Sequence, residues 1–95
     1  MQKQTKEDIE FFYKGVLSLT SVAECARFFD DIFTLAEREA IVQRFSVARM
    51  LAEGQNYIDI NTKTGASTAT ICRVNKCLVY GDGGYKTVLD RVMQK

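Results

Sequence analysis

Apolar residues recur at three- and four-residue spacing along most of the chain, which is the spacing of amphipathic α-helices. No stretch alternates apolar and polar residues as a half-buried β-strand does, and the chain has no proline. The pattern predicts an all-α fold. The stripes follow Thr5, Ser21, Thr34, Asn56 and Ser67, and a last one contains Val88, Leu89, Val92 and Met93.

The first three of these stripes follow residues that can cap a helix. Thr5 precedes the first, and Ser21–Glu24 and Thr34–Glu37 have the spacing of a capping box, in which a hydroxyl and a carboxylate each accept from a free amide. The longest helix is predicted from Thr34 to about Glu53, with Gly54 at its end. Its expected apolar side consists of Ile41, Phe45, Ala48 and Leu51/Ala52, widened by Val42 and Met50.

Residues 56–79 have the length, the capping residues and the turn glycine of a helix-turn-helix. Asn56 can cap a short helix that contains Tyr57 and Ile60. Gly65 suits the left-handed residue that ends such a helix, and Ser67 can cap the second helix. The apolar positions of the second helix are Ile71, Val74 and Leu78.

The opposite face of the second helix is suited to DNA. It consists of Ala69, Cys72, Arg73, Lys76 and Tyr80, with Thr68 at its leading end. Small side chains let a helix approach base edges, and arginine and lysine reach guanine edges or phosphates. The predicted DNA-binding residues are Ser67, Thr68, Ala69, Thr70, Cys72, Arg73 and Lys76, with Asn56, Tyr57 and Lys63 as phosphate contacts. The alternative is an ordinary helical hairpin with a solvated basic face.

The charge distribution favours the DNA interpretation although the net charge is only +1. Residues 1–54 carry a net charge of −2 and residues 55–95 a net charge of +3. The positive part contains the predicted helix-turn-helix, as attraction to phosphates requires. The 95 residues are expected to form one domain, and a chain of this size gains stability from a partner.

The composition argues against catalysis and metal binding. The chain has no histidine, which excludes Ser/His, Cys/His and two-histidine zinc sites. Cys25, Cys72 and Cys77 lack a metal-binding spacing and are expected to be reduced thiols. We expect no catalytic residues and no metal. Without a signal sequence or membrane-spanning stretch, the protein is expected in the cytoplasm.

Three segments together resemble a known family. They are FTLAEREAIVQR (residues 33–44), GASTATICRVNKCL (65–78) and YGDGGY (80–85), and they are similar to the tryptophan repressor superfamily, in particular its YerC/YecD-type branch. The resemblance implies a six-helix, interleaved homodimer that regulates transcription as a repressor by binding palindromic operator DNA. The two helix-turn-helix units of the dimer are expected about 34 Å apart, which is one turn of DNA.

The resemblance also implies an effector pocket between the long helix and the second helix of the helix-turn-helix. The residues kept from that pocket are Thr34, Arg44, Thr70 and Arg73. Val74 replaces a glycine and Cys77 a serine. A valine side chain intrudes on the space for an indole, and a thiol is a poor acceptor, so we expect no L-tryptophan cofactor. Three alternatives stay open for Arg44 and Arg73: they bind another small anion, they pair with carboxylates or, for Arg73, the side chain contacts DNA.

The first helix of the pair departs from the family pattern, with Asn61 at a position usually alanine and Thr64 at one usually apolar. These residues predict a short or loosely packed helix. They also leave open a second function, that of a helical protein-interaction or dimerisation module without specific DNA binding. Salt dependence separates the two, because phosphate contacts weaken steeply with salt.

Overall fold

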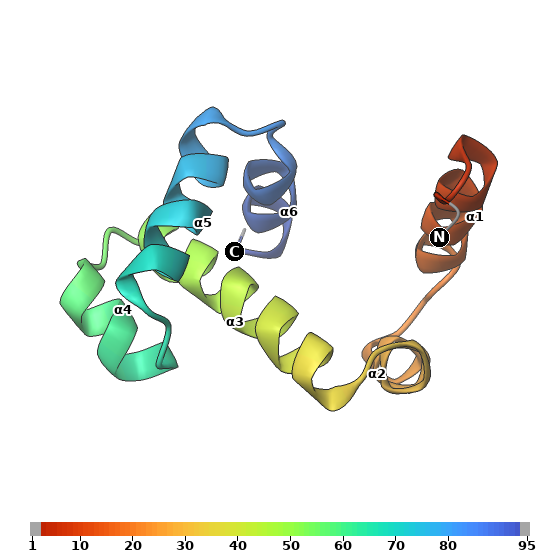
Figure 1. The fold of residues 1–95 in the computed structure, drawn as a ribbon, viewed down its shortest axis with the longest axis horizontal. Helices are drawn as coiled ribbons and strands as arrows, with labels where there is room; N and C mark the ends of the chain where they lie inside the picture. Colours follow the sequence, from red (N-terminus) through yellow and green to blue (C-terminus); the bar gives the residue numbers. More distant parts are fainter. Residues whose placement is uncertain (1–2, 94–95) are drawn as a thin grey trace. The chain divides into compact units, whose positions relative to one another are not determined.

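The computed structural model describes residues 3–93, which form six α-helices and no β-strand (Figure 1). The helices are α1 (Lys6–Leu17), α2 (Val22–Ile32), α3 (Leu35–Ala52), α4 (Tyr57–Thr64), α5 (Thr68–Tyr80) and α6 (Gly84–Val92). The predicted six-helix, all-α fold is confirmed. The chain divides into two compact units, Met1–Leu35 and Ala36–Lys95. That the whole chain acts as one domain stays a prediction.

The first unit contains α1 and α2, and both begin at the predicted caps. The Thr5 hydroxyl accepts from the Asp8 amide at 3.0 Å, and the Asp8 carboxylate accepts from the Thr5 amide at 3.3 Å. The Ser21 hydroxyl likewise accepts from the Glu24 amide at 3.1 Å. In the predicted capping box the Glu24 carboxylate accepts from the Ser21 amide, and the structure gives it a different partner. The Glu24 carboxylate accepts from the amide and hydroxyl of Thr20, at 2.9 and 3.1 Å, because Thr20 offers two donors to one oxygen.

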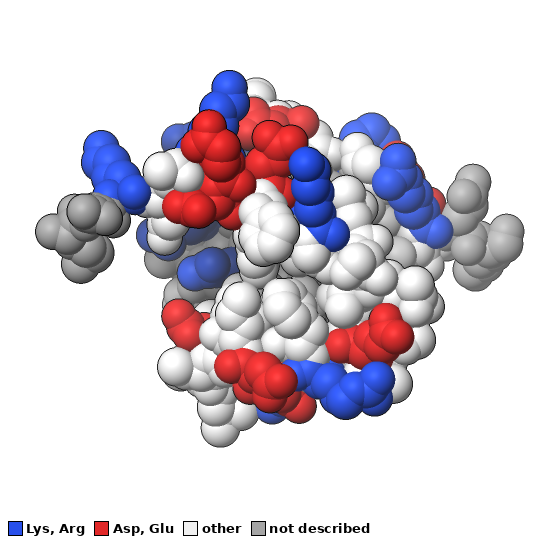
Figure 2. Space-filling view, turned by 90° about the vertical axis from the view of Figure 1, so that its right-hand side faces the viewer, with Lys and Arg blue, Asp and Glu red and all other residues white. Residues whose placement is uncertain are grey.

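Aromatic side chains link the two helices of the first unit. The ring centroids of Phe12 in α1 and Phe28 in α2 lie 6.2 Å apart. Within α2 and its C-cap, Phe29 stacks on Phe33 at 5.3 Å. No residue of either helix is buried, however, and Leu17 is 82% exposed. Figure 2, viewed from the side of α1, shows uncharged surface exposed between the acidic and basic side chains. The predicted apolar stripes therefore form, but a single chain does not cover them.

The second unit contains the hydrophobic core. α5 packs against both α4 and α6 and lies between them in Figure 1. The buried residues are Val47, Ala48, Ile60, Ala66, Ile71, Val74 and Leu89. They come from α3, α4, α5, α6 and the turn between α4 and α5, so the core fixes the helix-turn-helix against the long helix.

The buried side of α3 differs from the prediction. Val47 is fully buried although the periodicity did not select it, whereas Ile41 and Val42 remain 44% and 58% exposed. Ala48 is buried as predicted. The fully buried residues that α3 adds to the core are Val47 and Ala48. A helix that is apolar on more than one side does not specify by its sequence which side a given neighbour covers.

Candidate nucleic-acid interface

The helix-turn-helix has the predicted caps. The Asn56 side chain accepts from the Asp59 amide at 2.9 Å at the start of α4. Gly65 ends α4 in the left-handed conformation with φ of 74°, which a glycine adopts without a Cβ clash. The Ser67 hydroxyl accepts from the Thr70 amide at 3.1 Å and opens α5.

The two faces of α5 separate as the sequence predicts. Ile71 and Val74 are buried, and Leu78 packs against the core from its edge. On the other side Ala69, Arg73 and Lys76 are exposed to solvent. A helix with one face in the core and a basic, small-residue face in solvent can enter a major groove.

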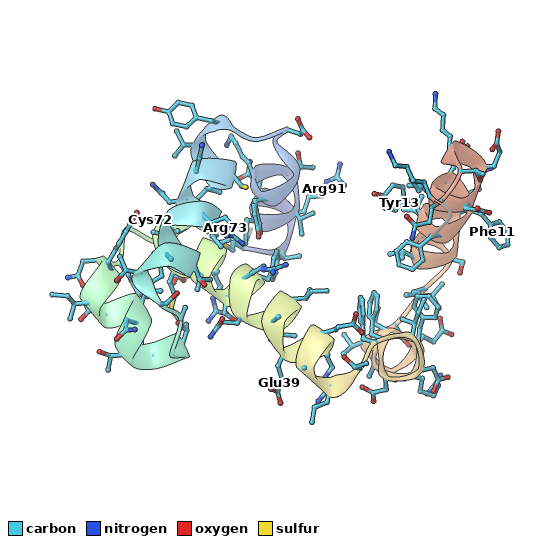
Figure 3. All side chains as sticks on the ribbon, viewed as in Figure 1. Phe11, Tyr13, Glu39, Cys72, Arg73 and Arg91 are labelled. Atoms are coloured by element: carbon cyan, nitrogen blue, oxygen red, sulfur yellow. The ribbon has the colours of Figure 1, made fainter. Side chains whose placement is uncertain are left out.

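The remaining predicted contact residues surround this face. Ser67, Thr68, Cys72, Asn56 and Lys63 are exposed, and Thr70 and Tyr57 are half-buried. Cys72 and Arg73 leave α5 on different sides in Figure 3. The predicted residues thus come from one structural pair, α4 and α5, but they do not all point in one direction.

Tyr57 is partly withdrawn from the surface by α5. Its hydroxyl lies close to the side chains of Cys72 and Asn75 in α5. Desolvation, followed by the neighbouring Cys72 thiol, raises the pKa of Tyr57 above its ordinary value, so the phenol stays neutral. The Tyr57 hydroxyl therefore joins α4 to α5, a contact that sequence reasoning missed because it joins residues 15 and 18 positions apart.

Side chains also hold the turn between α4 and α5. Asn61 Nδ2 donates to the Ala66 carbonyl at 2.7 Å, and the Thr64 hydroxyl accepts from the Ala66 amide at 3.1 Å. Gln43 Nε2 in α3 donates to the Thr64 carbonyl at 3.1 Å. α4 is short, with eight residues, in line with the expectation of a short or loosely packed helix, and its Ile60 is fully buried. The polar residues at positions 61 and 64 organise the turn.

The four residues of the predicted effector pocket are divided between the two units, so the pocket stays a prediction. Val74 is 2% exposed, so its side chain fills the core at the position where the repressor has a glycine. Thr70 accepts a hydrogen bond from the Ser67 hydroxyl at 3.1 Å and so takes part in the start of α5. Thr34 belongs to the first unit, whereas Arg44, Thr70 and Arg73 belong to the second.

Arg44 and Cys77 instead lie near Tyr85 of α6. Burial, followed by Cys77, raises the pKa of Tyr85, and the positive charge of Arg44 opposes this shift. An open groove of about 540 Å³ runs beside these residues, with Phe45, Cys77 and Tyr85 among those that line it. The groove is largely apolar at its surface, and Arg44 places positive charge beside Tyr85, one of the residues that line it.

Within residues 3–93, no group of three cysteine, aspartate or glutamate side chains is arranged to hold a metal ion. None of the six helices there combines the length and apolar character needed to cross a bilayer.

This fold and this site define a class of protein, an all-α protein that presents a helix-turn-helix. The sequence profile of the Trp repressor protein family matches residues 7–93. The chain belongs to the Trp repressor family, and within it to the YerC type. The family is one of regulators rather than enzymes.

Relatives support the assignment over nearly the whole chain. The uncharacterized protein YerC of Bacillus subtilis (strain 168) is 47% identical over 94 residues, covering 99% of this chain and 90% of YerC. A Trp repressor candidate from Staphylococcus aureus has a crystal structure that matches with a TM-score of 0.90 at 36% identity, covering 96% of this chain and 91% of the other. A TrpR-like protein from Eubacterium eligens matches with the same TM-score at 44% identity, covering 95% and 93%.

Proposed function

We propose that the protein is a transcriptional regulator that binds palindromic operator DNA as a homodimer. The observation that carries the proposal is the two-sided character of α5. Its apolar residues Ile71 and Val74 are buried, while Arg73 and Lys76 on the opposite side are exposed. The helix itself begins at the Ser67 cap. A helix that contacts base edges in a major groove needs one face held by the protein core and the opposite face free to enter the groove.

The proposal assigns two roles within the site. Ala69, Arg73 and Lys76, with Thr68 at their leading end, are assigned to the base edges, and Ser67 and Thr70 to the helix start. Cys72, also predicted for this face, is assigned to its border beside Tyr57. Asn56, Tyr57 and Lys63 of the first helix region contact phosphates. The Lys63 ammonium donates to the side-chain oxygen Oε1 of Gln55 at 2.9 Å, which keeps this charge beside α4 without neutralising it.

The homodimer part of the proposal is supported by uncovered apolar surface. Phe11 and Val22 in the first unit are 78% and 86% exposed, and Ile41 and Val42 on α3 are also exposed. Large apolar side chains left exposed on each unit are typical of protein interfaces. A symmetric pair of chains also matches the two half-sites of a palindrome.

The experiment that tests the proposal is selection of duplexes from a randomised library, followed by anisotropy titration of the enriched duplex at two salt concentrations. A palindromic consensus is expected. The affinity should fall about a thousandfold between roughly 50 and 200 mM salt if six or more phosphates are contacted. Failure to enrich any sequence at low salt would contradict the proposal.

The second candidate function, a protein-interaction module, is favoured by the same exposed apolar side chains and by the net charge of +1. An apolar protein interface responds little to salt. Weak, sequence-independent DNA binding together with a stable complex with another protein would support this function instead.

We further propose that L-tryptophan is not the effector. The support is Val74, whose buried side chain occupies the position where an indole needs space. Arg44 and Arg73 remain available to a different small anion. Thermal unfolding with a panel of amino acids and small anions tests this, because a ligand that binds the folded state raises the melting temperature. A concentration-dependent rise with L-tryptophan would contradict the proposal.

A further inference from the structure

Ala66, in the turn between α4 and α5, is nearly fully buried, at 1% exposed, yet its peptide groups have no partner in a regular helix ladder. Two side chains of α4 supply the partners. The Ala66 carbonyl accepts from Asn61 Nδ2 at 2.7 Å, and its amide donates to the Thr64 hydroxyl at 3.1 Å. Because buried peptide groups without partners are strongly disfavoured, these two bonds select one conformation of the turn.

A second pair of bonds ties this turn to the rest of the unit. The Thr64 hydroxyl donates to the Ile60 carbonyl at 2.7 Å, which fixes the side chain that holds Ala66. The Thr64 carbonyl accepts from Gln43 Nε2 at 3.1 Å. A continuous hydrogen-bonded connection therefore runs from α3 through the end of α4 to the residue before the Ser67 cap.

We infer that Gln43, Asn61 and Thr64 are positioning residues for DNA recognition, an inference that rests on the proposed function. They set the place of the α5 N-terminus, and the first residues of α5, Thr68 and Ala69, are those that approach the bases. Hydrogen bonds to base edges fail with shifts of a few tenths of an ångström, whereas attraction to phosphates tolerates them. The connection thus controls discrimination between sequences more than total affinity.

The test compares a specific and an unrelated duplex of equal length. Asn61→Leu, Thr64→Val and Gln43→Met each remove the hydrogen-bonding group with little change in volume. Each is expected to lower the affinity for the selected duplex about tenfold and to leave the affinity for the unrelated duplex unchanged. A variant that is merely less stable loses both affinities by the same factor, because only its folded fraction binds either duplex.

The chain offers matched controls for the threonine substitution. Thr62 lies in the same helix, is exposed, and donates its hydroxyl to the Ile58 carbonyl at 2.9 Å, away from the turn. Thr62→Val makes the same chemical change as Thr64→Val and is expected to keep the ratio of the two affinities. Thr64→Ser retains the hydroxyl and is expected to restore the ratio lost in Thr64→Val.

The outcomes separate the two proposals. If the wild-type protein selects a duplex but the three variants keep its ratio of affinities, or lose both affinities equally, the positioning role is overturned and the DNA-binding function stands. If the wild-type protein selects no duplex, both are overturned. If one variant fails to fold, the other two still decide the result.

Discussion

At the scale of single residues, α4 places similar side chains in opposite environments. Ile58 is 78% exposed, whereas Ile60, two positions later in the same helix, is fully buried. Ile60 contributes to the core that joins the helix-turn-helix to α3. The two isoleucines therefore provide an internal comparison of what burial contributes to stability.

Ile60→Val is expected to lower the free energy of unfolding by about 0.5–1.5 kcal/mol, because it removes one buried methylene and leaves a small cavity. Ile58→Val makes the same change at the surface and is expected to stay within about 0.5 kcal/mol of wild type. Denaturant titration followed by circular dichroism measures both. Equal effects of the two substitutions would show that Ile60 is not in the core in solution.

Arg73 is the side chain on which the DNA proposal makes its sharpest prediction. Arg73→Ala is expected to weaken binding to the selected duplex by about 1–3 kcal/mol, since a guanidinium that reads a guanine edge contributes to both affinity and specificity. Anisotropy titration at fixed salt measures the change.

The matched control is Arg91→Ala, because this substitution removes the same charge from a different helix, α6 (Figure 3). Arg91→Ala is expected to change the affinity only slightly. Similar losses for the two variants would mean that bulk charge, and not the face of α5, determines binding.

At the scale of elements, the helix ends are set by local chemistry. Gly54, Gly65 and Gly83 take positive φ angles, and each stands between consecutive helices. Thr5, Ser21, Asn56 and Ser67 accept from the first-turn amides they were predicted to cap. These features were predictable because capping depends on residues only three or four positions apart.

The same substitution at two glycines is expected to have opposite effects. Gly65→Ala should destabilise the second unit by about 1–2 kcal/mol, because its φ of 74° is costly for any residue with a Cβ. Gly15→Ala should stabilise α1 by about 0.5–1 kcal/mol, since Gly15 lies within that helix and a Cβ there meets no atom within 4 Å. Thermal unfolding of both variants measures the difference, and a change of the same sign at both positions would contradict this account.

At the scale of the whole molecule, the chain leaves much of its apolar surface uncovered. All of the residues classed as buried between positions 3 and 93 lie in the second unit, while Leu17, Val22 and Leu35 in the first unit are 82%, 86% and 62% exposed. Covering such side chains with a second surface is favourable, by about 25 cal/mol for each Å² of apolar surface removed from water.

If a second copy of the chain covers this surface, the melting temperature should rise with protein concentration, because mass action stabilises a folded dimer over unfolded monomers. Calorimetry at concentrations about a hundredfold apart, with sedimentation equilibrium, tests this. Leu17→Glu is expected to shift the protein toward the monomer by placing a charge in the interface. A concentration-independent melting temperature and a monomeric mass would contradict the dimer.

The sequence by itself determined the six helices, the caps at Thr5, Ser21, Asn56 and Ser67, the helix-turn-helix and the two faces of α5. All of these follow from residues close together in the chain, whose spacing fixes which side chains share a face or reach an amide. Ile71 and Val74 were identified as core, and Arg73 and Lys76 as exposed, from this periodicity alone.

Only the tertiary structure decided which apolar side of α3 is buried and what holds the turn. Val47 and not Ile41 enters the core, and Gln43 reaches Thr64 across 21 residues. Asn61 and Thr64, which by sequence weaken α4, instead satisfy the peptide groups of the buried Ala66. Such pairings depend on how helices pack in space, and local spacing carries no information about contacts between distant segments.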